Sequence, residues 1–345
     1  MINLNVEPKS AYIVTDFVAR KYFSGIEVSE GVLLITPSGK TYLTDMRYYH
    51  AVEKLLKGSL IKCAVYNGIE SVKKALDDEG VESVFIDYGK VTVKEYKEYL
   101  DLGYKVLDCA SVFDSARAIK NQSEIESVKK ACSIIQKVYY EGIKSIKAGI
   151  TEKQLKKVFE DLMVEYGAEG PSFDTIVAFN ENSAVPHHQT CESALIENSV
   201  VLVDMGCKVN GYCSDITRTA FFGKPSKKFI DCYNAVLNAN QIAIENIGEK
   251  TLTDKADAFA RDYLKEQGVG EFFTHSLGHG VGLEIHEYPT LSPKKSQVLE
   301  NGMVFTIEPG VYFAGEFGIR IEDVVMLKDG KTQRLYTDDK NLLIL

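Results

Sequence analysis

Two aspartates flank a predicted turn, at a spacing that could hold metal ions. Asp215 follows Asp204 by eleven residues, and Asn210-Gly211 between them is the strongest short-range signal for a two-residue hairpin turn. With that turn, Val209 pairs with Tyr212, and the two aspartates become diagonal neighbours on one strand face, roughly 7–8 Å apart at the backbone. Two carboxylates this close repel each other unless a cation lies between them, and a metal pair about 3.5–4 Å apart would fit the gap.

Three further candidate ligands follow in the second half of the chain. His279 lies among glycines, where backbone can approach a ligand closely, and Glu308 ends a predicted strand. The alternation over residues 318–325 predicts a strand that carries Arg320 and Glu322 on one face. Four carboxylates and one imidazole make a hard, oxygen-rich site, which favours manganese, cobalt, zinc or iron over a thiolate-bound metal.

The order of these residues, and the phrases around them, resemble the pita-bread metallopeptidases, which include methionine aminopeptidase, aminopeptidase P and prolidase. The phrases are Asp204-Met205-Gly206, Ser214-Asp215-Ile216-Thr217-Arg218-Thr219, Gly278-His279-Gly280-Val281-Gly282-Leu283, Ile307-Glu308-Pro309-Gly310 and Arg320-Ile321-Glu322-Asp323. The resemblance covers essentially the whole chain. It implies a dinuclear metallopeptidase, and the N-terminal domain described below resembles that of the branch that cleaves next to proline.

The resemblance also implies how the metals are held. Two divalent ions, with manganese expected first and cobalt, zinc or iron as alternatives, would share five ligands. Asp204 would bind one ion, His279 and Glu308 the other, and Asp215 and Glu322 would bridge both. Such a pair can lower the pKa of a bound water towards neutrality, so that it attacks the scissile carbonyl.

Four residues are expected to act directly on the substrate or its protons. His187, in Ala184-Val185-Pro186-His187, matches a family histidine that contacts substrate, and His286 matches one that binds the substrate carbonyl. Glu308 would relay a proton from water to the leaving nitrogen. Arg320 would either bind the peptide or support a ligand carboxylate, and the sequence leaves both roles open.

The remaining histidines receive other expectations. His188 follows His187 directly and would point away from the site on a strand, as a surface or supporting residue. His275 is expected to be structural. If residues 279–286 formed one straight strand, His279 and His286 would face opposite ways, so the glycines at 280 and 282 must bend the chain if both face the site.

Two domains are predicted from the pattern of elements. Residues 1–118 alternate short strands and helices as a small α/β domain, and Tyr22-Phe23-Ser24-Gly25 resembles the creatinase-type N-terminal domain of prolidases and aminopeptidases P. Residues 111–119 are expected to form the connection. Residues 119–345 repeat an order of two helices followed by strands, which predicts a pseudo-twofold α+β domain with the pita-bread fold.

Helix boundaries in the second domain follow from capping signals. Ser123 with Glu126 predicts a helix that runs to about Lys147, and Thr151 with Gln154 predicts the next. The second pair of helices is predicted over residues 226–247 and 253–266.

Composition narrows the partners and the compartment. A net charge of −9 argues against nucleic acid or an anionic membrane as partner, and 45% hydrophobic residues are typical of a soluble globular protein. No secretory signal or membrane-spanning run is visible, and seven irregularly spaced cysteines fit reduced thiols, so a cytoplasmic location is expected. A homodimer is expected from family likeness and from the frequency of twofold assemblies.

Substrate length divides the two closest activities. Aminopeptidase P removes a residue before proline from longer peptides, whereas prolidase cleaves only Xaa-Pro dipeptides. Prolidase-like sequences often carry arginine where this chain has Thr290, and that arginine suits a dipeptide carboxylate. The sequence therefore favours an Xaa-Pro aminopeptidase, with an Xaa-Pro dipeptidase anchored by Lys294 or Lys295 as the alternative. A metal-free hydrolase like creatinase and a non-catalytic binding protein are remote alternatives, because the full ligand set is present.

Overall fold

The chain divides into two compact units, Met1–Ala116 and Arg117–Leu345. The computed structural model describes residues 4–345, so the first three residues of the domain predicted over 1–118 lie outside the description. Within the described residues, no helix is both long enough and apolar enough to cross a bilayer.

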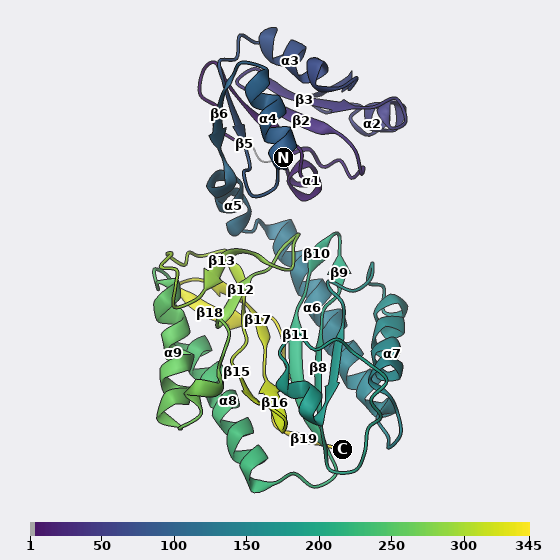
Figure 1. The fold of residues 1–345 in the computed structure, drawn as a ribbon, viewed down its shortest axis with the longest axis vertical. Helices are drawn as coiled ribbons and strands as arrows, with labels where there is room; N and C mark the ends of the chain where they lie inside the picture. Colours follow the sequence, from purple (N-terminus) through teal and green to yellow (C-terminus); the bar gives the residue numbers. More distant parts are fainter. Residues whose placement is uncertain (1–3) are drawn as a thin grey trace. The chain divides into compact units, whose positions relative to one another are not determined.

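A six-stranded mixed sheet forms the centre of the first unit (Figure 1). In spatial order its strands are β4 (Ile61–Val65), β3 (Gly39–Thr44), β2 (Val32–Thr36), β1 (Ser10–Val14), β5 (Ser83–Ile86) and β6 (Lys105–Asp108). The helices of this part are α1 (Phe17–Ser24), α2 (Tyr49–Leu55), α3 (Ile69–Asp77), α4 (Val93–Asp101) and α5 (Ala110–Ala118). Tyr12 and Val14 belong to one apolar cluster and Ala11 and Ile13 to another, because successive side chains of a strand face opposite sides of the sheet.

The second unit contains two rounds of two helices followed by strands, as the sequence predicted. The first round comprises α6 (Gln122–Gly142), α7 (Glu152–Glu165), β7 (Ile176–Phe179), β8 (Ser199–Met205), β9 (Lys208–Val209), β10 (Tyr212–Cys213) and β11 (Ile216–Phe222). The second round comprises α8 (Lys227–Asn246), α9 (Thr253–Glu266), β12 (Gly278–Gly280), β13 (Glu287–Leu291), β14 (Val304–Ile307), β15 (Gly310–Phe313), β16 (Phe317–Arg320), β17 (Asp323–Lys328), β18 (Lys331–Arg334) and β19 (Leu343–Ile344).

Each helix pair packs on the strands of its own half, and Figure 1 shows the two pairs on opposite sides of this unit. One sheet has the order β19-β11-β8-β7 and another the order β13-β12-β14-β17-β18, while β15 and β16 form a separate ribbon. The pita-bread α+β architecture predicted for this part of the chain is confirmed, and the strands that carry the candidate ligands lie between the two helical layers.

The hairpin register was predicted correctly. Val209 pairs with Tyr212, and Asp204 lies opposite Thr217 in the β8–β11 ladder. Asn210 and Gly211 have φ angles of 52° and 78°, as a tight turn of the mirror-image type requires at both central positions. Local turn chemistry therefore sets which residues of the two strands face the site.

Three predicted boundaries were wrong. Helix α6 is capped by Asn121 and Glu124 instead of Ser123 and Glu126, because the Asn121 side chain accepts the Glu124 N–H at 3.1 Å and the Ser123 hydroxyl only donates to Asn121. The same helix ends at Gly142 and is followed by a 3₁₀ turn, so it does not continue to Lys147. The predicted connection over residues 111–119 is mostly helix α5.

The strand predicted over residues 318–325 is interrupted at its centre. β16 ends at Arg320 in the ribbon with β15, and β17 starts at Asp323 in the sheet with β14. The chain changes sheets at Ile321 and Glu322. Ile319 and Ile321 still lie in the core, whereas Arg320 and Glu322 face the cavity described below, so the predicted division of faces holds across the break.

Candidate metal centre

The hairpin brings Asp204 and Asp215 to one face of the β8–β11 pair. Asp204 lies opposite Thr217, and Asp215 precedes Thr217 by two residues and so shares its face. The strands approach closely here because residue 206 is glycine: a Cβ atom on Gly206 would lie 1.9 Å from the carbonyl oxygen of Ser214. Both aspartates bury an Oδ1 atom that has no hydrogen-bond partner among the described residues.

His279 lies in β12 between two glycines that allow neighbouring strands to close on it. A Cβ atom on Gly278 would lie 2.1 Å from a carbonyl oxygen of β14, and one on Gly280 would lie 2.2 Å from a carbonyl oxygen of β13. The β12–β13 register shifts between His279 and Gly280. The loop after it returns His286, and the centroids of the two imidazoles are 4.3 Å apart. The chain between His279 and His286 therefore bends, and the bend allows both imidazoles to face the same site.

The hydrogen bonding of His279 leaves a nitrogen lone pair directed at carboxylates. Its Nδ1 lies 3.1 Å from the carbonyl oxygen of Gly280. A carbonyl can only accept a hydrogen bond, so Nδ1 carries the proton and donates. Its Nε2 lies 3.3 Å from Glu308 Oε1 and 3.7 Å from Asp215 Oδ2. Burial and the neighbouring His286 lower the pKa of His279 to about 4, so the ring is neutral. A neutral lone pair facing two carboxylates is the arrangement of a metal ligand set, since a cation must lie between them.

Glu308 and Glu322 come from the ends of strands and are each held by one hydroxyl. Thr306 donates to Glu308 Oε1 at 3.0 Å, and Thr217 donates to Glu322 Oε2 at 2.6 Å. Ligand atoms of Asp215, His279 and Glu322 all lie within 4.8 Å of one another. Each glutamate is therefore positioned by a hydroxyl of the protein, and its carboxylate retains lone pairs that can bind a cation.

The carboxylates are electrostatically crowded. Burial raises the pKa of both Asp215 and Glu322 well above their ordinary values, and the charges of the neighbouring carboxylates raise them further. Burial and the charge of Asp204 raise the pKa of Glu308 to about 8. Buried like charges disfavour ionisation, and divalent cations reverse that preference. The unpartnered oxygens, the lone pair of His279 and this crowding all fit a site for divalent metal ions.

Arg320 is surrounded by protein partners. It donates to Asp204 Oδ2 at 2.6 Å, to the hydroxyl of Tyr312 at 2.8 Å and to the hydroxyl of Thr217 at 3.1 Å. The Tyr312 O–H in turn faces Nε2 of His275 at 2.9 Å, and burial followed by the charge of Arg320 lowers the pKa of His275 to about 3. Of the two roles left open for Arg320, support of a ligand carboxylate is the one that its contacts match.

A cavity of about 500 Å³ opens beside these groups. It brings together every residue that the sequence proposed as a ligand or a catalytic group, including His187, His286 and Arg320. The lining residues are Phe173, Asp174, Ile176, Pro186, His187, Asp204, Asp215, His275, Ser276, Gly278, His279, Ile285, His286, Thr290, Glu308, Arg320 and Glu322. Polar groups from both halves of the unit therefore converge on one apolar-walled cavity, as in small-molecule sites generally.

His188 turns away from the cavity that His187 lines. Its Nε2–H donates to Glu152 Oε2 at 2.8 Å, and the Cys191 N–H donates to the same oxygen at 3.0 Å. His188 therefore has the supporting position that its adjacency to His187 predicted. His50 lies in the first unit, away from this group of residues in the sequence.

Sequence reasoning missed the hydroxyls that orient the glutamates and the arginine. Thr217 lies two residues after Asp215, and Thr306 two residues before Glu308. The same strand alternation that located the carboxylates could have identified both threonines. Tyr312 gave no such signal, because the chain leaves β14 before Glu308 and enters β15 at Gly310, so one strand alternation does not connect Glu308 with Tyr312.

Two known protein families match the chain, one on each side of a point close to the boundary between the two compact units. Residues 126–329 match the family described as Metallopeptidase family M24. Residues 6–119 match the Creatinase/Prolidase N-terminal domain. The first match spans more than half of the chain and contains all five candidate ligands.

Individual relatives resemble the chain over nearly its whole length. The Xaa-Pro dipeptidase of Pyrococcus furiosus is 36% identical over 325 residues, which cover 93% of this chain and 92% of that protein. The solved structure of the Xaa-Pro dipeptidase from Bacillus anthracis has a TM-score of 0.93 at 33% identity and covers 97% of this chain and 95% of its own. The X-Pro aminopeptidase of Thermotoga maritima has a TM-score of 0.88 at 32% identity and covers 97% of each chain.

Proposed function

Because this chain belongs to metallopeptidase family M24, we propose that it hydrolyses the peptide bond before proline, with Xaa-Pro dipeptides as its principal substrates. The arrangement that carries the proposal is the group of four carboxylates and a neutral imidazole at the cavity wall, of which Asp204, Asp215 and Glu322 are buried. The dipeptidases among its relatives support dipeptides as substrates over the longer peptides that the sequence alone favoured.

Five side chains would hold the metal ions: Asp204, Asp215, His279, Glu308 and Glu322. When bound, two divalent ions supply a water nucleophile at neutral pH and polarise the scissile carbonyl. The donor set is rich in carboxylate oxygen, which suits manganese among the first-row metals, and we propose manganese as the native metal. Metal analysis of the purified protein tests that choice.

The chain's own residues complete the reaction around those ions. His187 and His286 line the cavity on the substrate side and can donate hydrogen bonds to the oxyanion that forms at the carbonyl. Glu308 can take the proton of the attacking water and return it to the leaving nitrogen of proline. Arg320 keeps Asp204 oriented through their 2.6 Å contact. Ile176 and Ile285 give the cavity apolar surface on which a substrate side chain or ring can pack.

A second candidate function is an Xaa-Pro aminopeptidase that accepts longer peptides. Thr290 lies in the cavity wall, and among the described lining residues the single Lys or Arg is Arg320, which is already paired with Asp204. A strict dipeptidase needs a cation for the substrate's C-terminal carboxylate. The lining of the cavity therefore supports acceptance of peptides that continue beyond proline.

Steady-state kinetics with matched peptides test both candidates. The manganese-loaded protein is assayed with Gly-Pro, a Gly-Pro-Xaa tripeptide, and Gly-Ala as the control without proline. We expect Gly-Pro to give the highest kcat/KM and hydrolysis to disappear after chelation and return with Mn²⁺. A higher kcat/KM for the tripeptide would favour the aminopeptidase, and no hydrolysis of either proline peptide would refute the proposal.

We also propose that the protein is a homodimer, because closed twofold assemblies are the commonest oligomers of soluble enzymes. Sedimentation or light scattering at the assay concentration tests this. A monomer with full activity would contradict it.

A further inference from the structure

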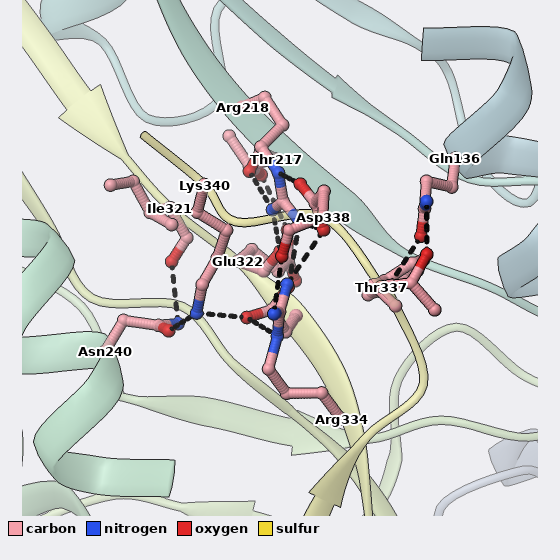
Figure 2. A network of polar contacts seen from close by, with 12 residues as sticks. Gln136, Thr217, Arg218, Asn240, Ile321, Glu322, Arg334, Thr337, Asp338 and Lys340 are labelled. Carbon is pink, nitrogen blue, oxygen red and sulfur yellow. Dashed lines mark hydrogen bonds and ion pairs between the residues drawn. The ribbon is translucent and has the colours of Figure 1, made fainter. Parts of the chain in front are cut away.

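A single buried amide contacts the backbone next to two candidate metal ligands. Asn240, fully buried on helix α8, donates through Nδ2 to the carbonyl of Ile307 at 2.8 Å and to that of Ile321 at 3.2 Å. Ile307 directly precedes Glu308, and Ile321 directly precedes Glu322. Figure 2 shows the contact between Asn240 and Ile321. One side chain thus ties together two strand ends that are fourteen residues apart in the sequence.

These two contacts constrain where each glutamate side chain starts. A carbonyl group and the Cα atom of the next residue belong to one planar peptide unit. When the carbonyl orientation of Ile307 and Ile321 is held, the Cα positions of Glu308 and Glu322 are held with it. A metal site requires ligands within about 0.5 Å of the productive geometry, so the spacing of these two backbones matters for binding.

Lys340 determines which way the Asn240 amide points. Its Nζ donates to Asn240 Oδ1 and, at 2.7 Å, to Asp323 Oδ2. An ammonium group can only donate, so the amide oxygen faces Lys340 and the NH₂ group faces the two carbonyls. Lys340 is itself buried in a left-handed conformation with a φ angle of 57°, and Tyr233 donates to its carbonyl at 2.9 Å. Such a conformation is strained for a residue other than glycine, so its surroundings must hold it.

The peptide unit after Glu322 is held by the same group of residues. Arg218 donates to the carbonyl of Glu322 at 2.5 Å and to that of Thr217 at 2.9 Å (Figure 2). Asp323 accepts from Arg218 at 2.9 Å and from Arg334 at 3.0 Å. The carbonyls of Ile321 and Glu322 are therefore both bound by buried side chains that are not among the residues lining the cavity.

We propose that Asn240, oriented by Lys340, is a positioning residue that sets the spacing of Glu308 and Glu322 for binding divalent metal ions. The inference rests on the proposed function only in taking these two glutamates as metal ligands. It assigns a role in the metal centre to helix α8 and to the C-terminal segment, neither of which supplies a ligand.

Metal titration of the substrate-free protein tests the role. In Asn240→Asp the side-chain shape and the contact with Lys340 are retained, but a carboxylate oxygen replaces the NH₂ donor opposite two carbonyls. We expect calorimetric titration of the metal-stripped protein with Mn²⁺ to show that at least one ion binds with a Kd about 10–100-fold higher than in the wild type. Lys340→Met keeps the length of the side chain but removes its donors to both Asn240 Oδ1 and Asp323 Oδ2. The NH₂ group of Asn240 is retained and only its orientation is no longer fixed, so a smaller weakening is expected.

Gln136 provides a matched control in the same region. It is a helix amide that also contacts the C-terminal segment, through Thr337 at 2.9 Å in both directions, but it touches no carbonyl beside a ligand (Figure 2). Gln136→Ala should leave the Mn²⁺ affinity unchanged. The visible spectrum of the Co²⁺-loaded protein should change in Asn240→Asp and stay as in the wild type in Gln136→Ala.

Wild-type Mn²⁺ affinity in folded Asn240→Asp would overturn the inference, as would an equal loss in Gln136→Ala. If Asn240→Asp does not fold, Lys340→Met is compared with Gln136→Ala instead. Wild-type Mn²⁺ affinity in Lys340→Met, or an equal loss in both variants, would then overturn the inference. The readout uses no peptide. Failure of the wild type to cleave Xaa-Pro peptides would therefore refute the proposed function without affecting this test.

Discussion

Replacement of Glu152 by glutamine should destabilise the segment that carries His187. The Glu152 carboxylate is fully buried at the start of α7. Its Oε1 accepts from the N–H of Phe179 and from Nδ2 of Asn182, each at 2.8 Å. Its Oε2 accepts from His188 at 2.8 Å and from the N–H and thiol of Cys191 at 3.0 and 3.2 Å. The donors come from both sides of His187 in the sequence.

The size of the effect follows from these contacts. A glutamine can replace only one of the two oxygens, and its NH₂ group must then face donors. With the NH₂ group at the Oε1 position, the N–H of Phe179 loses its acceptor, whereas the amide of Asn182 keeps its contacts with Ser193 and Cys191. A buried donor left unsatisfied costs about 1–3 kcal/mol, so the loss at Phe179 alone should lower the free energy of unfolding of Glu152→Gln by roughly 1–3 kcal/mol.

Thermal and urea denaturation measure this loss directly. In a unit of this size each kcal/mol corresponds to about 2–4 °C in Tm. The control is Glu192→Gln, because Glu192 lies nearby with its side chain 70% exposed and pairs with exposed Lys153. That variant should stay within about 0.5 kcal/mol of the wild type. If Glu152→Gln is as stable as Glu192→Gln, the carboxylate does not organise this segment.

The stability that the Glu152 carboxylate contributes should also depend on pH. Burial alone would raise the pKa of Glu152, but hydrogen bonds from Asn182, Cys191 and His188 more than offset it, and the pKa lies below its ordinary value of 4.5. A depressed pKa in the folded state contributes stability above pH 4.5, which is lost as the pH falls through the folded-state pKa. The difference between wild type and Glu152→Gln should therefore be constant near neutral pH and shrink in acid.

Three further predictions concern the metal ligand Asp215, the contact of His286 with the substrate carbonyl, and the length of the substrate. Asp215→Ala should lose at least one of two metal ions by elemental analysis, because Asp215 is proposed to bridge them, and retention of both at wild-type affinity would contradict bridging. His286→Ala should keep its full metal content while kcat falls on the order of 10²–10³-fold, so a lost metal or unchanged turnover would refute carbonyl binding. Thr290→Arg should raise the kcat/KM ratio of Gly-Pro to Gly-Pro-Xaa about ten- to a hundredfold, since a charge-assisted contact contributes roughly 1.5–3 kcal/mol. An unchanged ratio would show that residue 290 does not meet the substrate carboxylate.

Local chemistry was sufficient wherever the determinants are neighbours in the sequence. Asn210-Gly211 supplies the two positive φ angles of the turn, and the turn alone fixes the register that brings Asp204 and Asp215 to one face. Strand alternation likewise put Arg320 and Glu322 on the same face. The family and the pita-bread fold were also accessible, because the phrases around the five candidate ligands are short and contiguous.

Where two local signals overlap, the sequence alone could not choose between them. Asn121 with Glu124 and Ser123 with Glu126 are both capping patterns, and the side-chain contacts select the first. The break between β16 and β17 had no local signal either. It arises because the chain leaves the ribbon with β15 and joins β14, which is a property of the neighbouring strands.

Only the tertiary structure decided which ligand each supporting side chain contacts. Asn240 is 67 residues from Ile307, and Thr217 is 105 residues from Glu322. In the sequence Asn240 is a polar residue in an amphipathic helix with nothing to mark it as buried. Its contacts form only when α8 packs against the ends of β14 and β16. The residue types and order of the site are thus encoded locally, whereas their relative positions depend on long-range packing, since no local rule relates residues so far apart in the chain.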